Sequence, residues 1–211
     1  MDIRTIEIRT HGRYLVSSPP QATGLLVGFH GYKENAAIHL EVLKQIAGDR
    51  SVRLVSVQGT HRFYASGNRI VAGWMTSEDR ELAIADNIAY VSAVVAEVER
   101  EYGPSSSLVY VGFSQGVAMA YRAAAFAPHP CDGLIVLAGD IPPEVVPVAA
   151  RLPSTLLGRG VQDEYYTPAK AAPDCKILEE ANVKCEEFVF DGGHAWHESF
   201  IARAGAFLDE R

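Results

Sequence analysis

The sequence has no long hydrophobic run. No uninterrupted apolar stretch among its 211 residues approaches the roughly 20 residues that a helix needs to span a bilayer. Residues 1–4 also lack the basic and then apolar order of a secretion signal. Both absences predict a cytoplasmic protein without stable membrane anchoring.

Positive charge is also scarce. The 19 Lys and Arg residues are outnumbered by 26 Asp and Glu residues, which gives a formal net charge of −7. With no block of Lys or Arg, the chain has no electrostatic footprint for nucleic acid or for an anionic membrane surface. This balance favours a small neutral or lightly charged molecule as the partner.

Cysteine is rare as well. Cys131, Cys175 and Cys185 are odd in number and show no C-x-x-C spacing, which argues against a disulfide framework and against a zinc site. We expect all three to be packing residues and expect no bound metal.

The composition that is present, 48% hydrophobic and 21% charged residues, is typical of a globular protein. The length fits a single domain over residues 1–211. Short apolar runs alternate along the chain with segments of helical periodicity. The patterns predict strands at residues 14–16, 24–29, 52–57, 108–111, 133–138, 154–161 and 184–190, and helices at residues 34–47, 77–102, 117–127, 169–181 and 196–208.

Strands that are apolar throughout, alternating with helices, predict an α/β fold whose mostly parallel central sheet carries helices on both faces. Residues 3–10 alternate apolar and polar side chains and predict an edge hairpin with the strand at 14–16. Residues 58–76 are rich in aromatics and glycine and read as a long irregular loop, a kind of segment that is often functional. Residues 141–151 leave room for one short helix only, so no large cap domain is expected there.

The rest of the chain is organised around residues 107–127. An apolar run leads into Gly112-Phe113-Ser114-Gln115-Gly116, and an Ala-rich segment follows. G-x-S-x-G between a strand and a helix is the pattern of a nucleophile elbow, a strained turn that exposes the serine hydroxyl. Ser114 is therefore the candidate nucleophile.

A serine hydroxyl needs a general base, and the base needs an acid to hold its tautomer. His194 is the preferred base because it follows a strand and two glycines, and His197 is its nearest rival. His11, His39, His61 and His129 are expected on surface turns or helices, and His30 is expected to brace its loop. Asp163 and Asp140 each follow a strand, and Asp163 is favoured as the acid. The order Ser114, Asp163, His194 matches the serine, acid, histidine order of known hydrolases.

Negative charge on a tetrahedral intermediate is commonly held by two backbone N–H groups. The sequence predicts one donor at Gln115 and the other at Tyr32, after His30-Gly31. Aromatic and apolar residues near strand ends are candidates to line a substrate pocket, namely Phe63, Trp74, Ile141 and Trp196.

These motifs together resemble the α/β-hydrolase fold and, more narrowly, the phospholipase/carboxylesterase family that includes acyl-protein thioesterases. The resemblance covers most of the chain from about residue 24 onward. It is carried by Phe29-His30-Gly31-Tyr32, Gly73-Trp74, Gly112-Phe113-Ser114-Gln115-Gly116, Asp163 and Gly193-His194.

The resemblance implies a monomer or homodimer that needs no cofactor and hydrolyses carboxylic esters or thioesters of small molecules. The same residues would also serve a lactone, dienelactone or small-peptide hydrolase, or a relative acting on C–C bonds. A catalytically silent binding protein on the same fold is the alternative from another functional class.

Overall fold

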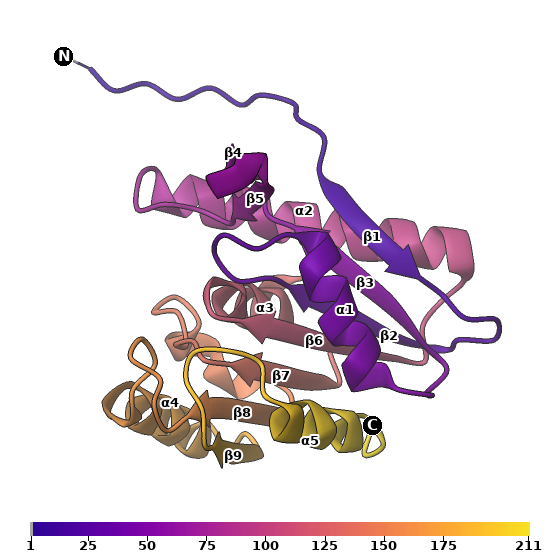
Figure 1. The fold of residues 1–211 in the computed structure, drawn as a ribbon. Helices are drawn as coiled ribbons and strands as arrows, with labels where there is room; N and C mark the ends of the chain where they lie inside the picture. The colour runs from indigo at the N-terminus through magenta and orange to yellow at the C-terminus, as the bar shows by residue number, and fades with distance from the viewer. Residues whose placement is uncertain (1) are drawn as a thin grey trace.

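The computed structural model describes residues 2–211, and its centre is a seven-stranded sheet (Figure 1). The strand order is β1-β3-β2-β6-β7-β8-β9, with β1 antiparallel to β3 and every other pair parallel. The central strands are buried on both faces, as their continuous apolar sequences require. The strands are β1 (Arg13–Ser17), β2 (Gly24–Phe29), β3 (Val52–Gln58), β6 (Ser107–Phe113), β7 (Gly133–Leu137), β8 (Thr155–Gly160) and β9 (Cys185–Phe190).

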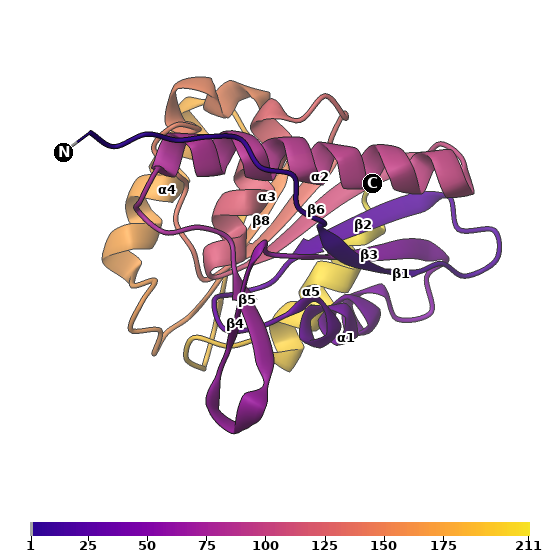
Figure 2. The ribbon, with the colours of Figure 1, turned by 90° about the horizontal axis from the view of Figure 1, so that it is seen from above.

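Helices cover both faces of this sheet, as Figure 2 shows. α1 (Ala36–Ala47) and α5 (Glu198–Leu208) pack together on one face. α2 (Arg80–Tyr102), α3 (Gln115–Phe126) and α4 (Pro168–Glu180) lie on the other. The segment from 141 to 151 holds only a short 3₁₀ helix, η2 (Val146–Arg151), so no cap domain is inserted there. The predicted α/β architecture is confirmed.

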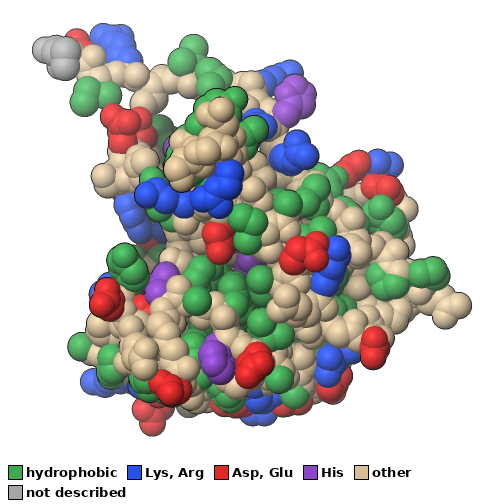
Figure 3. All heavy atoms as spheres, viewed as in Figure 1, with side chains coloured by type: hydrophobic (Ala, Val, Ile, Leu, Met, Phe, Trp, Pro, Cys, Tyr) green, Lys and Arg blue, Asp and Glu red, His purple; other side chains and the backbone are tan. Residues whose placement is uncertain are grey.

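The prediction of a strand at residues 3–10 is wrong. These residues form no regular structure, and Ile3, Ile6 and Ile8 are 86%, 87% and 78% exposed. Figure 3 shows this arm standing clear of the body of the molecule, with apolar side chains exposed along it. Alternation predicts a strand only where a neighbour can pair with its backbone, and β1 pairs with β3 instead.

The prediction of an irregular loop at residues 58–76 is also wrong. The segment contains an antiparallel hairpin of β4 (His61–Tyr64) and β5 (Ile70–Gly73), joined through the 3₁₀ turn η1 (Ser66–Asn68). Gly67 and Asn68 make the reversal in the left-handed region, with φ values of 69° and 56°. The Ala72 amide donates to the Glu34 carbonyl at 2.8 Å, which ties the hairpin to the loop after β2.

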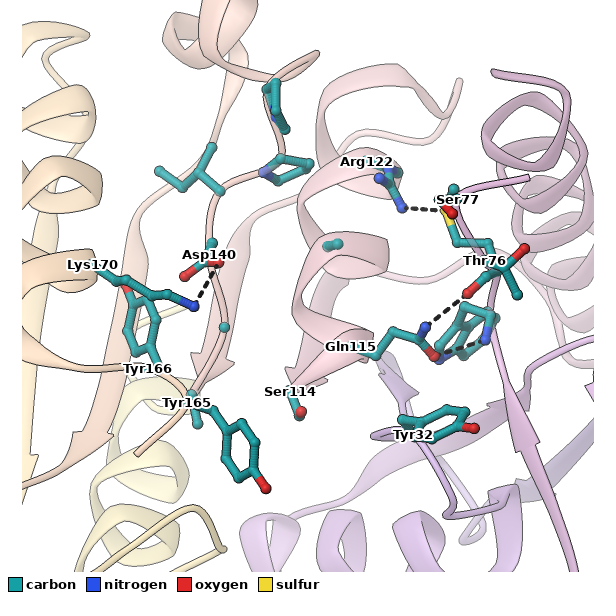
Figure 4. Close-up of a pocket in the computed structure, with 18 of the residues that line it drawn as sticks. Tyr32, Thr76, Ser77, Ser114, Gln115, Arg122, Asp140, Tyr165, Tyr166 and Lys170 are labelled. Carbon is teal, nitrogen blue, oxygen red and sulfur yellow. Dashed lines mark hydrogen bonds and ion pairs between the residues drawn. The ribbon is translucent and has the colours of Figure 1, made fainter. Parts of the chain in front are cut away.

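The long helix begins later than predicted. α2 starts at Arg80 and is preceded by Asp79 in the left-handed conformation, with φ of 46°, so Ser77 is not its N-cap. Thr76 accepts a hydrogen bond from the Glu78 amide at 3.2 Å, and this turn competes with a helical start. Thr76 and Ser77 thereby border a cleft, and neither caps the helix (Figure 4).

Two absences bear on the earlier expectations. Among the described residues, no helix combines the length and the apolar character needed to cross a membrane.

The three cysteines are unpaired, and burial raises the pKa of Cys131 and of Cys185 to about 12, so both thiols stay protonated near neutral pH.

Candidate active site

Ser114 lies on a sharp turn between β6 and α3, with φ of 52° and ψ of −118°. The turn depends on close backbone contacts. A Cβ on Gly116 would lie 2.0 Å from the Phe29 carbonyl oxygen, and one on Gly112 would lie 2.6 Å from the Gly116 carbonyl oxygen. The Ser114 amide is held by the Leu137 carbonyl at 2.9 Å. Glycine at both positions is therefore a steric requirement of this elbow.

The structure brings Ser114, His194 and Asp163 together. His194 Nε2 lies 2.8 Å from Ser114 Oγ, and His194 Nδ1 lies 2.9 Å from Asp163 Oδ2. The Asp163 side chain is fully buried, and its Oδ1 accepts the amides of Tyr165 and Tyr166, each at 2.8 Å. These two backbone bonds fix the carboxylate, and both of its oxygens lie within hydrogen-bond distance of His194 Nδ1, Oδ1 at 3.0 Å and Oδ2 at 2.9 Å.

Backbone packing accounts for the meeting of Asp163 and His194. Gly160 ends β8, and a Cβ there would lie 2.2 Å from the Gly192 carbonyl oxygen in the turn after β9. The Gln162 amide also donates to that carbonyl at 2.9 Å. Because Gly160 and Gly192 both lack a side chain, the turn that holds His194 can approach the loop that holds Asp163.

Asp140 does not contact His194. Its carboxylate is 54% exposed and forms an ion pair with Lys170 at 3.7 Å, on the opposite side of the cleft from Arg122 (Figure 4). His197 is the N-cap of α5, accepting the Ser199 amide through its ring and stacking on Phe190, with 5.0 Å between ring centroids. Neither of the two rivals from the sequence reaches the serine.

Two other histidines are buried. His30, expected to brace its loop, accepts the Gly59 amide at 3.0 Å through Nε2, and burial lowers its pKa. His39 was expected on a surface, and that expectation is wrong, because the ring is fully buried beneath Gly28 and beside Trp196. Burial lowers the His39 pKa to about 3, so this ring is neutral near pH 7.

Two backbone amides beside Ser114 have no partner among the described residues. Gln115 is the first residue of α3, so its N–H lies beyond intrahelical bonding, and the Tyr32 N–H makes no hydrogen bond within residues 2–211. The Tyr32 loop is held in place by Glu34, whose carboxylate accepts the Gly31 amide at 2.8 Å. Burial raises the pKa of Glu34, although that bond opposes the shift.

Side chains brace the same region from the other side. The Gln115 side chain accepts the Trp74 amide at 2.9 Å and donates to the Met75 carbonyl at 3.0 Å. The Trp74 indole is fully buried and donates to the His30 carbonyl at 2.9 Å. Trp74 therefore positions the loop after β2 and offers no indole surface to a ligand.

A cleft with a volume of about 930 Å³ opens above Ser114 (Figure 4). Of the residues expected to line it, Ile141 lies in its wall and the buried Trp74 lies directly behind that wall, whereas Phe63 and Trp196 do not line it. The Phe63 ring packs on Tyr32, with 5.5 Å between centroids, and the Trp196 ring packs against Phe113 and Phe200. Phe63 lies within β4 and Trp196 in the turn after β9, and both rings are used in packing contacts.

Sequence reasoning missed several wall residues. Tyr165 presents its ring edge-on to His194, with 4.9 Å between centroids, and Arg122 enters the cleft from α3. Glu34 was missed as well. The sequence holds a signal for the first two of these residues. Tyr165 lies two residues after the candidate acid, and Arg122 is a lone charge in an Ala-rich helix. No cluster of three or more His, Cys, Asp or Glu side chains suited to a metal ion occurs among the side chains that the structure describes.

One wall of the cleft rests on Asp174, a buried carboxylate. Its Oδ2 accepts the Tyr166 hydroxyl at 2.8 Å and the Ile141 amide at 3.2 Å. Burial raises the Asp174 pKa from 3.8 to about 6, against the opposing effect of those two hydrogen bonds. Between these pKa values the folded protein holds a proton that the unfolded chain has released, so ionisation of Asp174 lowers stability as the pH rises.

Asp174→Asn should therefore gain stability relative to the parent protein as the pH increases. We expect the difference in free energy of unfolding to shift by about 2 kcal/mol in favour of the variant between pH 4 and pH 7. Urea unfolding of both proteins at several pH values measures that difference. Because the other titrating groups are common to both proteins, their contributions cancel in the subtraction. A difference independent of pH would contradict the assignment.

The sequence matches the family model described as phospholipase/carboxylesterase over residues 12–210. A comparison with curated proteins finds no match. Among solved structures, esterase PE8 is 23% identical, with 96% of this chain and 99% of that chain covered and a TM-score of 0.75. The Zea mays acyl-protein thioesterase 2 is 17% identical, with coverages of 95% and 99% and a TM-score of 0.74. The Bacillus cereus carboxylesterase is 16% identical, with 94% of each chain covered and a TM-score of 0.73.

At these identities the solved structures establish the fold, and the family match establishes the membership. The resemblance drawn from the motifs is therefore confirmed, as is the α/β-hydrolase fold. The protein belongs to the phospholipase/carboxylesterase family and is a carboxylic ester hydrolase.

Proposed function

We propose that the protein cleaves esters or thioesters of small molecules through an acyl-enzyme formed on Ser114. His194 acts as the general base and Asp163 orients it. One observation carries the proposal: Ser114 Oγ, the two ring nitrogens of His194 and Asp163 Oδ2 form a continuous series, with separations of 2.8 and 2.9 Å. That series is the arrangement a serine needs to become a nucleophile near neutral pH.

In the first half of the reaction Ser114 Oγ attacks the substrate carbonyl carbon, and its proton passes to His194 Nε2. Asp163 accepts the hydrogen bond from Nδ1–H, which keeps Nε2 free to take the proton and stabilises the imidazolium that forms. The bond to the leaving alcohol or thiol then breaks, and His194 returns the proton to that leaving group. An acyl ester on Ser114 remains.

The tetrahedral intermediate places negative charge on the former carbonyl oxygen. We assign the N–H groups of Tyr32 and Gln115 as its hydrogen-bond donors, because both are unpartnered and both flank Ser114. Each such donor typically contributes about 3 kcal/mol to the stability of the transition state. Glu34 acts through the backbone here, by fixing the Gly31 amide one residue before Tyr32.

In the second half a water molecule enters the place of the leaving group. His194 takes a proton from that water, and the water oxygen attacks the acyl carbon. The bond between that carbon and Ser114 Oγ then breaks, His194 returns the proton to Oγ, and the carboxylic acid is released. Every step uses side chains and backbone groups of this chain and requires no added cofactor. The names of the Bacillus cereus carboxylesterase and the Zea mays thioesterase support both an oxygen and a sulfur leaving group.

A fluorophosphonate probe tests the proposal, since only an activated serine reacts with it. We expect labelling of one residue per chain, and peptide mass analysis should find the label on Ser114. Hydrolysis of a panel of esters and thioesters of graded acyl length then gives the preferred leaving group. Absence of labelling, as for a silent binding protein on this fold, or labelling at another residue would overturn the assignment.

A further inference from the structure

The cleft is rich in positive charge although the chain carries a net charge of −7. Lys33, Arg80, Arg122 and Lys170 line it, and Asp140 is the only acidic residue among its described lining residues. Potentials inside a cleft depend on the charges within about 10 Å, because salt screens those farther away. Glu144, Asp163 and Asp174 contact lining residues from behind the wall and offset part of this charge. The surplus of positive charge is therefore local to the wall that carries Arg80 and Arg122.

Arg122 is the most buried of these cations. Its side chain is only 5% exposed, and its Nε donates to Glu144 at 2.6 Å. Its Nη1 contacts the sulfur of Met75 at 3.3 Å, while Nη2 has no hydrogen-bond partner within residues 2–211 and is not sealed from solvent. A buried guanidinium that keeps one free donor edge toward a cleft is suited to bind an anion.

The position of Arg122 on α3 relates it to the candidate nucleophile. Gln115, Ala118 and Arg122 follow one another at helical spacing on the face that borders the cleft. Arg122 lies eight residues after Ser114, about 12 Å along the helix axis, and its side chain leans back toward the helix start. The small Ala118 leaves the space between them open.

The charges around Arg122 do not cancel. Glu144 is shared, with Oε1 bonded to Arg122 at 2.6 Å and Oε2 bonded to Arg80 at 2.7 Å. Burial alone would raise the pKa of Glu144, but the hydrogen bonds from the two arginines outweigh it and hold the pKa below its usual value. Two guanidinium groups and one carboxylate leave a surplus of one positive charge, whereas Asp140 and Lys170 balance each other.

Hydroxyl groups stand beside this surplus charge. Thr76 and Ser77 lie next to Arg122 on one side of the cleft, with Ser114 between that side and the Asp140–Lys170 pair (Figure 4). A guanidinium edge with adjacent hydroxyl donors can supply hydrogen bonds to both oxygens of a carboxylate. A single surplus charge also suits a carboxylate monoanion better than a phosphate dianion.

We propose that the substrate is an ester or thioester with a free carboxylate remote from the scissile bond, and that Arg122, aided by Arg80 and the Thr76 and Ser77 hydroxyls, binds this carboxylate. The inference rests on the proposed hydrolysis at Ser114 and names the substrate class for that site. Arg122 contacts the substrate without taking part in bond making, so it determines specificity.

Matched pairs of activated esters test the proposal. Each pair consists of the 4-nitrophenyl monoester of a dicarboxylic acid, from adipic to sebacic acid, and the same compound with its free carboxylate methylated. We expect kcat/KM to be about tenfold or more higher for the acid than for its methyl ester at one or more chain lengths. The preference should shrink as sodium chloride is added.

Three variants locate the preference. Arg122→Met and Arg80→Met should each reduce the acid to methyl ester ratio, Arg122→Met by about tenfold. Arg159→Met is the matched control, because Arg159 is also ion-paired and only 14% exposed but bonds Glu187 outside the cleft, and it should leave the ratio unchanged. Arg80 is half-exposed, so its replacement is less demanding on the fold. If Arg122→Met does not fold, the ratio measured for Arg80→Met and the salt dependence of the parent protein decide whether the carboxylate site exists.

The outcomes separate this inference from the proposed function. If the protein hydrolyses the methyl esters but shows no preference for the acids, the carboxylate site is overturned and the serine mechanism stands. A preference that survives both arginine substitutions overturns the site equally. If neither member of any pair is hydrolysed and no serine is labelled, the proposed function itself fails, and this inference fails with it.

Discussion

Replacing Ser114 with alanine is expected to lower kcat/KM for a simple ester such as 4-nitrophenyl butyrate by at least about a thousandfold. The substitution removes the oxygen that lies 2.8 Å from His194 Nε2 and with it the proposed nucleophile. Residual turnover would come from water held near the proposed oxyanion donors. Initial rates at several substrate concentrations, with the parent protein measured in parallel, give the ratio.

The fold should survive this change. Alanine at position 114 bears the same backbone cost at φ of 52° as serine does, and the Ser114 hydroxyl makes no hydrogen bond besides the one to His194 within the described residues. We expect the free energy of unfolding to change by less than about 1 kcal/mol. Retained turnover in a folded Ser114→Ala protein would assign the chemistry to another residue.

Asp163→Asn is expected to lower kcat by about a thousandfold to ten-thousandfold. The reason lies in the backbone around position 163. Two amides, those of Tyr165 and Tyr166, point at Oδ1, so the asparagine must place its oxygen there. Its NH₂ group then takes the place of Oδ2, 2.9 Å from His194 Nδ1, and can donate to that nitrogen, while Oδ1, 3.0 Å from Nδ1, already accepts the two amides. The variant therefore favours the ring tautomer with its proton on Nε2, in which the histidine cannot accept the proton of Ser114.

Asp140→Asn is the matched control for Asp163→Asn. Asp140 also follows a strand and also borders the cleft, but its partner is Lys170 and its carboxylate is half exposed. We expect a loss of less than about fivefold in kcat, because the ion pair is exposed and contributes little. A large loss for Asp140→Asn together with a small loss for Asp163→Asn would reverse the assignment of the acid.

The sequence could predict the features that depend on local patterns. Apolar runs such as residues 24–29 and 133–137 predict buried strands because a strand covered on both faces has no polar side. The elbow was predictable because its G-x-S-x-G pattern spans only five residues and Gly112 is required by a contact with the Gly116 carbonyl inside it, whereas the contact of Gly116 with Phe29 is visible only in the fold. The pair of candidate acids stayed open, since both follow strands, and the contact between Gly160 and Gly192 is visible only in the fold.

Features set by long-range packing could not be predicted. Residues 3–10 have the alternation of a strand but lack a neighbour for their backbone, which no local pattern reports. Phe63 and Trp196 lie near the ends of β4 and β9, and the direction of their rings depends on packing against Tyr32 and Phe113. Arg122 was missed because an arginine on a helix is ordinarily solvent-exposed, whereas here Glu144 draws it inward.

The contact between Gly116 and the carbonyls of Phe29 and His30 has a further consequence. It presses the start of α3 against the end of β2, so the segments that carry the Gln115 and Tyr32 amides are in van der Waals contact before any ester arrives. The spacing of these two dipoles is set first by main-chain contacts, and the Glu34 carboxylate reinforces it through the Gly31 amide. Little reorganisation energy is then needed when charge develops on the substrate oxygen.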